Sequence, residues 1–105
     1  MILVKIKGKE YPYRYDFGAI LHYEQLAQSF KDKGLQLNNS TNSALMHYAC
    51  LLSGEDFSES YEGFLAAIDT RETFDALNAA FDREYARWEG RSHVTRQATQ
   101  KSKKK

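Results

Sequence analysis

The sequence predicts an α+β fold: an N-terminal β-hairpin, about four helices, and a disordered basic C-terminal tail. Apolar and polar residues alternate on both sides of Gly8, which is typical of paired strands. From residue 16 to residue 89, apolar residues recur at helical spacing between capping residues and glycines. After Gly90 that periodicity stops. We therefore place one globular domain at residues 1–89 and a tail at residues 90–105.

We expect strands at residues 2–7 and 10–15, with Gly8-Lys9 as the turn, because glycine readily supplies a positive φ. Pairing Lys7 with Glu10 would place three apolar residues opposite three tyrosines on one face: Ile2 with Tyr15, Val4 with Tyr13, and Ile6 with Tyr11. Pro12 has no N–H, so its strand should be an edge strand. The apolar face needs cover from the helices or from another chain.

The first helix should begin after Asp16, a good N-cap, and run to about Lys33, with Gly34 ending it in the left-handed conformation. Its inward residues share helical spacing. They are Ile20, Tyr23, Leu26, Ala27 and Phe30, widened by Phe17 and Leu21.

The second helix, expected at about residues 42–53, contains the segment ALMHYACLL and should end at Gly54. This segment is apolar on nearly every side, and a helix of that kind is normally buried all round. We therefore expect a central core helix. Because the domain is small, part of the helix surface is also a candidate for contact with another chain.

A short helix should follow Phe57-Ser58, and a last helix should begin at Asp69, with Glu72 completing a capping box, and end at about Glu89. The short helix should direct Tyr61, Phe64, Leu65 and Ile68 inward. The last helix should do the same with Phe74, Leu77, Phe81, Tyr85 and Trp88.

The net charge of +1 conceals a division of the chain into an acidic body and a basic tail. Six Lys and Arg residues and no acidic residue follow Gly90, which leaves nine basic and fourteen acidic side chains in residues 1–89. Such a body is a poor nucleic-acid surface. Cys50 is the only cysteine, and we see no signal peptide or membrane span, so we expect a cytoplasmic protein.

The sequence contains no recognisable catalytic or cofactor-binding motif. His47 and Cys50 lie three residues apart, but two ligands are too few for a structural zinc site. The acidic residues of the second half are most simply solubilising, and no His or Ser is spaced to form a triad with them. The tyrosines at 11, 13 and 15 could stack on bases, but they share the apolar face of the hairpin. We expect no catalytic residue, no metal and no cofactor.

The segment GKEYPYRYDFGAILHYEQL resembles the opening of the tail assembly chaperones of long-tailed bacteriophages and related prophages. Members of that family commonly begin with a short hairpin, an aromatic-rich second strand and a helix. The matching residues are Gly8, Lys9, Glu10, Tyr11, Phe17, Ala19, Leu21 and Glu24. The resemblance covers the first quarter of the chain.

The resemblance implies a non-enzymatic role in the host bacterial cytoplasm: binding the tape measure protein and helping tail-tube subunits assemble around it. We also expect the chain to associate with itself. The family has no short set of catalytic residues that could be carried over to this chain. From surface character alone, the candidate partner-binding residues are Leu45, Met46, Leu51, Leu52, Glu59 and Glu62.

The basic tail has three interpretations. It is a solvated terminus, or an arm that makes this a small nucleic-acid-binding protein, which is the main alternative function. The third follows from the resemblance, since many family members also exist in a longer form made by ribosomal frameshifting. Lys103-Lys104-Lys105 could be encoded by a slippery adenine run.

Overall fold

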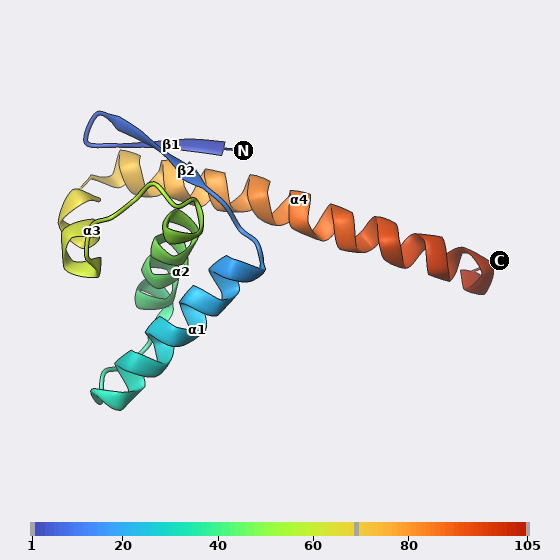
Figure 1. Cartoon of the computed structure of the whole chain (residues 1–105), viewed down its shortest axis with the longest axis horizontal. Helices are drawn as coiled ribbons and strands as arrows, with labels where there is room; N and C mark the ends of the chain where they lie inside the picture. The colour runs from blue at the N-terminus through green and yellow to red at the C-terminus, as the bar shows by residue number, and fades with distance from the viewer. Residues whose placement is uncertain (1, 69, 105) are drawn as a thin grey trace.

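A computed structural model of the chain describes residues 2–68 and 70–104, and the side chains of these residues up to Gly90. The elements are β1 (Ile2–Ile6), β2 (Lys9–Tyr13), α1 (Phe17–Asp32), α2 (Asn39–Ser53), α3 (Tyr61–Ala67) and α4 (Arg71–Lys104) (Figure 1). The described residues thus form a two-stranded hairpin followed by four helices, and the predicted α+β fold is confirmed. No helix among them is both long enough and apolar enough to cross a membrane.

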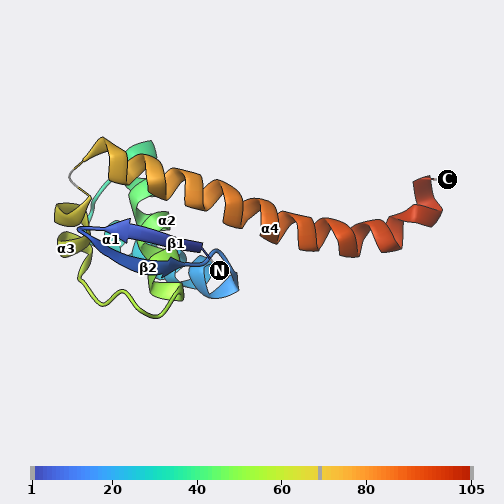
Figure 2. The same cartoon turned by 90° about the horizontal axis from the view of Figure 1, so that it is seen from above.

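Helix α2 lies at the centre of the fold, as predicted. It contacts α1, α3, α4 and strand β2, while α4 packs along β1 (Figures 1 and 2). Its end fits closely against the hairpin, because a Cβ atom on Gly54 would collide with the backbone carbonyl of Pro12. The backbone N–H of Arg14 also donates to the carbonyl of Cys50 at 3.1 Å. The helices therefore cover the hairpin.

The hairpin register differs from the prediction by two residues. Ile2 pairs with Tyr13, and Val4 pairs with Tyr11. The turn is Lys7-Gly8, whose φ values of 51° and 82° are both positive, as a type I′ turn requires. Because a shift of two residues preserves the alternation of faces, the apolar residues and tyrosines still share one buried face.

Pro12 lies opposite Leu3, as a consequence of that register. Counting from the two-residue turn, this is a pair that exchanges no ladder hydrogen bonds. The missing N–H of Pro12 therefore removes no hydrogen bond between the strands. Because the sheet has only two strands, both are edge strands, as expected for β2.

The core joins the hairpin face to α2, α3 and α4. Its largest fully buried side chains are Tyr13, Phe64, Leu45, Leu51, Leu77 and Cys50. Phe81, which was expected to face inward, is only partly buried and packs against this cluster. The rings of Tyr48, Phe57 and Phe64 contact one another at angles typical of aromatic pairs.

Four residues predicted to face inward are instead exposed: Phe17, Leu21, Leu65 and Tyr85. On α1 only Ala19 is buried, since this helix packs against α2 through a narrow stripe. The predicted widening of the α1 stripe by Phe17 and Leu21 was therefore wrong, whereas the five residues of the stripe itself are partly buried: Ile20, Tyr23, Leu26, Ala27 and Phe30.

The helix ends agree with the predictions at most positions. Asp16 caps α1 by accepting from the N–H of Ala19, and Gly34 follows the helix with a φ of 76°. At the start of α4, Thr70 Oγ1 accepts from the N–H of Thr73, while the predicted cap Asp69 lies outside the described residues. Helix α4 continues past the expected end at Glu89, and no proline interrupts the sequence there. The side chains of the tail lie outside the described residues, so its disorder stays a prediction.

Candidate functional site

The candidate partner-binding residues occupy three different environments. Leu45 and Leu51 are fully buried in the core, so they cannot form a contact surface in this fold. Met46 and Leu52 are partly buried against the same core. Glu59 and Glu62 are exposed, before and within the first turn of α3. The structure therefore leaves Met46, Leu52, Glu59 and Glu62 as candidates.

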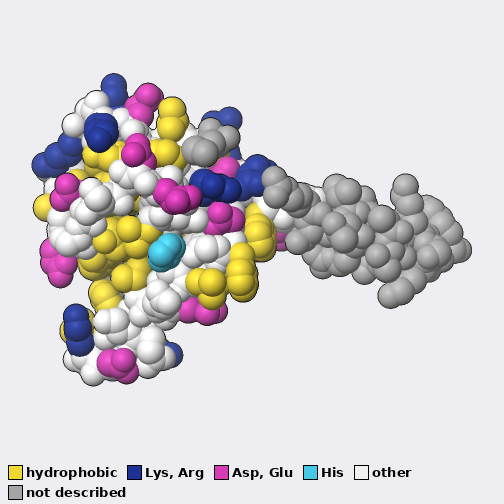
Figure 3. All heavy atoms as spheres, in the orientation of Figure 1, with side chains coloured by type: hydrophobic (Ala, Val, Ile, Leu, Met, Phe, Trp, Pro, Cys, Tyr) yellow, Lys and Arg dark blue, Asp and Glu magenta, His cyan; other side chains and the backbone are white. Residues whose placement is uncertain are grey.

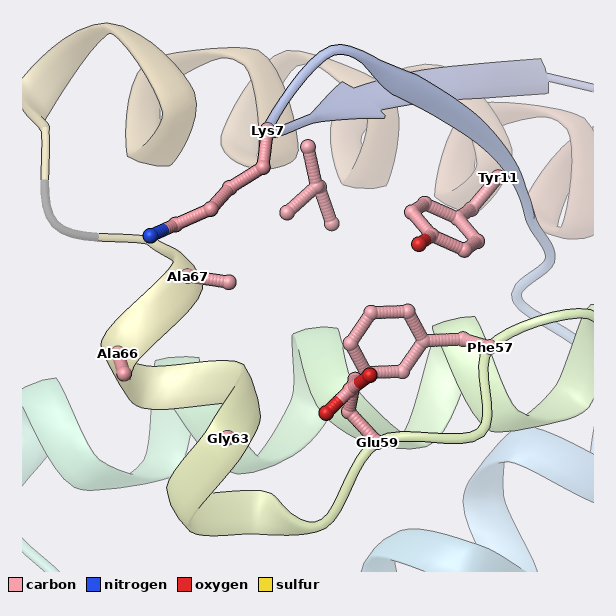
Figure 4. Close-up of a pocket in the computed structure, with 8 residues that line it drawn as sticks. Lys7, Tyr11, Phe57, Glu59, Gly63, Ala66 and Ala67 are labelled. Atoms are coloured by element: carbon pink, nitrogen blue, oxygen red, sulfur yellow. The ribbon is translucent and has the colours of Figure 1, made fainter.

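One pocket, of about 230 Å³, lies between the hairpin turn and α3 (Figure 4). The ring of Tyr11 meets that of Phe57 edge to face, with centroids 5.0 Å apart, and forms its apolar wall. Lys7 extends along one side, and Glu59 points into the pocket beside Phe57 (Figure 4). This small pocket combines an apolar wall with one positive and one negative side chain.

A second, larger pocket lies where α1, α2 and α4 meet, and we call it the three-helix pocket. Its volume is about 350 Å³. It is lined by Tyr23, Asn42, Ser43, Met46, His47, Asn78 and Phe81. Met46 is thus the one candidate partner-binding residue in this pocket. Apolar walls with a few fixed polar groups are typical of binding sites.

His47 is a polar lining residue of the three-helix pocket and is only 3% exposed. Its Nε2 lies 2.8 Å from Asn78 Oδ1, and its Nδ1 lies 2.6 Å from the hydroxyl of Tyr13. Because an amide oxygen only accepts, Nε2 carries the proton, and Nδ1 accepts from Tyr13. This network ties β2, α2 and α4 together and fixes the orientation of Asn78.

Burial lowers the pKa of His47 from its ordinary value of 6.5, although Asn78 and the carboxylate of Asp82 oppose the shift. The unfolded chain therefore takes up a proton first as pH falls, and the stability of the fold should decrease from about pH 7 downward through the lowered pKa. The rings of Phe74 and Phe81 also pack on His47 and favour the neutral form.

We predict that His47→Gln removes most of this pH dependence between about pH 7 and 5. Urea denaturation at several pH values measures it, and His22→Gln on α1 is the matched control. An unchanged pH slope in His47→Gln would show that another group is responsible.

Cys50 is fully buried near the same Tyr13. Burial raises the pKa of its thiol to about 12. A thiol with such a pKa is a poor nucleophile and a poor metal ligand. Among the described residues, no group of three or more His, Cys, Asp or Glu side chains could hold a metal ion.

A half-buried ion pair within α4, between Glu84 and Arg87, also binds the backbone of Tyr15, which precedes α1. Glu84, which the sequence suggested was an outer solubilising residue, is 2% exposed. Its Oε1 accepts from Arg87 Nη2 at 2.9 Å and from the backbone N–H of Tyr15 at 3.0 Å. Burial raises the pKa of Glu84, but the hydrogen bonds from Arg87 and Tyr15 outweigh it, so the net pKa is lowered. This ion pair has a structural role.

Large apolar side chains are exposed on the surfaces of α1 and α4. Phe17 is 62% exposed and Leu21 is 44% exposed, one turn apart on α1. Tyr85 is exposed on α4 and contacts Tyr15, which lies two residues before the start of α1. In Figure 3 hydrophobic side chains gather over more than one part of the visible face, between acidic groups. We call Phe17 and Leu21 the α1 patch.

Comparisons of the chain with protein-family models, with curated proteins and with solved structures found no match.

Proposed function

We propose that this chain is a non-catalytic tail assembly chaperone of a long-tailed bacteriophage or prophage. It binds the tape measure protein, helps tail-tube subunits assemble around it in the host bacterial cytoplasm, and associates with itself. The proposal rests on the resemblance of the hairpin and first helix, together with the α1 patch.

The α1 patch is the observation that carries the proposal. Phe17 and Leu21 both belong to the segment that resembles the family, and both are exposed instead of packing into the core. An apolar pair on an otherwise polar helix surface suits the binding of an apolar helix face on a partner. The exposed carboxylates Glu59 and Glu62 add acidic surface around α3 and favour a partner with basic groups.

Co-expression with the tape measure protein from the same genome tests the proposal. We predict that the tape measure protein stays soluble and co-purifies with the wild-type chain, and that Phe17→Ser with Leu21→Ser weakens the complex about tenfold or more, because apolar contact area is lost. Gln25→Ser, an exposed change on the same helix, is the matched control. A tape measure protein that aggregates equally with and without the wild-type chain would overturn the proposal.

The alternative function is nucleic-acid binding through the basic tail, favoured by the six basic residues after Gly90. It requires DNA binding that weakens steeply with salt and disappears when residues 91–105 are deleted. Electrophoretic mobility shifts at low salt separate the two functions, because a chaperone needs no such binding.

A further inference from the structure

We propose that the three-helix pocket binds a peptide segment of a partner protein through a backbone carbonyl beside an apolar side chain. Neither the resemblance nor the α1 patch assigns this site. The inference follows from the way that two asparagine amides are oriented at the pocket.

Both amides have their oxygen held by a group of this chain. Asn42 Oδ1 accepts from the hydroxyl of Tyr23 at 2.7 Å, and Asn78 Oδ1 accepts from His47 Nε2 at 2.8 Å. Since the oxygen atoms are occupied, the Nδ2 groups are the ones available to a ligand. The hydrogen-bonding contacts of the described residues use neither Nδ2 group. The pocket thus presents two oriented N–H donor groups.

The donors are held by different elements, which makes the arrangement rigid. Asn42 is on α2 and its partner Tyr23 is on α1, while Asn78 is on α4 and its partner His47 is 3% exposed on α2. Donors fixed in this way lose little conformational entropy when a ligand binds.

The other lining residues of the pocket determine which kind of side chain fits next to the carbonyl of the bound peptide. Met46 and Phe81 are partly buried and supply apolar surface. A volume of about 350 Å³ is near the lower end of the range for ligand pockets, so it suits one or two side chains with their backbone. A methionine beside an aromatic ring adapts to side chains of different shape.

The charges near the pocket favour a neutral acceptor over a carboxylate. Asp82 lies four residues after Asn78, on the same side of α4, and its charge acts on His47. Asp75 lies three residues before Asn78 and is paired with Arg71 at 3.7 Å. A carboxylate ligand would be repelled by Asp82, whereas a peptide carbonyl would not.

This inference takes the identity of the partner, the tape measure protein, from the proposed function. It deepens that function because it specifies a second contact in addition to the α1 patch. The probe is therefore the tape measure protein, divided into overlapping fragments, with binding to the full-length chain measured by calorimetry.

Asn42→Asp and Asn78→Asp are the decisive variants. Each keeps the oxygen that accepts from Tyr23 or His47 and replaces the N–H donor group by a second acceptor. We expect each to weaken the binding of a fragment about tenfold, because the carbonyl of the peptide would face an acceptor. Asn39→Asp, which adds the same charge on α2 outside the pocket lining, should bind as the wild type does.

The outcomes separate the two proposals. If no fragment binds the wild-type chain, the proposed function fails and this site fails with it. If a fragment binds the wild type and both pocket variants equally, while Phe17→Ser weakens it, the proposed function stands and the pocket proposal is overturned. Equal weakening by Asn39→Asp would overturn it as well, by showing a general charge effect. Circular dichroism of each variant confirms that it is folded.

Discussion

Phe64→Ala should lower the free energy of unfolding by about 4 kcal/mol, since it removes a fully buried ring and leaves a cavity. The ring contacts those of Tyr48 and Phe57, with centroid separations of 5.4 and 5.9 Å. It is the main link from α3 to the core, because α3 has no other buried residue. Urea denaturation followed by circular dichroism measures the change.

Leu65→Ala is the matched control, one residue further along the same helix. Leu65 is 42% exposed, so its loss should cost less than about 1 kcal/mol. Equal effects of the two changes would contradict the orientation of α3, because that orientation buries Phe64 and exposes Leu65.

The same pair shows what the sequence of α3 left undetermined. Spacing of three and four residues is compatible with either Phe64 or Leu65 facing inward, and α3 has only seven residues, which is too short for the pattern to select one face. The long, regular stripe of α4 predicted Leu77 correctly, and the unbroken apolar segment of α2 predicted its central position.

The sequence predicted correctly which side chains share the buried face of the hairpin, but it predicted the wrong pairing register of the two strands. The alternation of side chains fixes which residues are buried, but it is unchanged by a shift of two positions. The choice of Lys7-Gly8 over Gly8-Lys9 depends on Lys7 adopting a positive φ, which a lysine seldom does. Composition therefore pointed to the wrong turn residue.

The three-helix pocket could not be predicted, because its residues come from three separate parts of the chain and are of common types. Asn42 and Asn78 become informative only when Tyr23 and His47 are seen to hold their oxygen atoms. The sequence did contain a signal for Glu84, which was missed. Glu84 lies seven residues after Leu77 and three after Phe81, on the buried side of α4.

The α1 patch and the three-helix pocket both use residues of α1, but on different sides of it, because Tyr23 lies about 200° around the helix from Leu21. The two sites therefore require separate segments of the partner: an apolar helix face for the α1 patch, and for the pocket a non-helical segment, because the carbonyls inside a helix already accept from its own N–H groups. Leu45 and Leu51, suggested by their apolar character, are fully buried and contribute only to the packing of α2 in the core.

Glu84→Ala should destabilise the fold by about 3 kcal/mol. It leaves the backbone N–H of Tyr15 without its acceptor and Arg87 without its partner, and an unsatisfied buried donor alone costs about 1–3 kcal/mol. Arg87 is half-exposed, so water can solvate its charge. The loss of stability should therefore be smaller than the loss caused by breaking an ion pair whose two members are both buried. Asp82→Ala, an exposed acid on the same helix, should change stability by less than about 0.5 kcal/mol.

The pH dependence of the same variant separates the charge of Glu84 from its packing. Because the pKa of Glu84 is lowered in the fold, its contribution is present above the ordinary carboxyl value and is lost as pH falls through the lowered pKa. The difference in unfolding free energy between the wild type and Glu84→Ala should therefore be constant near pH 6 and shrink below about pH 4. A difference that stays constant down to pH 3 would mean that Glu84 acts through its packing, and that the ion pair with Arg87 contributes little to holding α1 against α4.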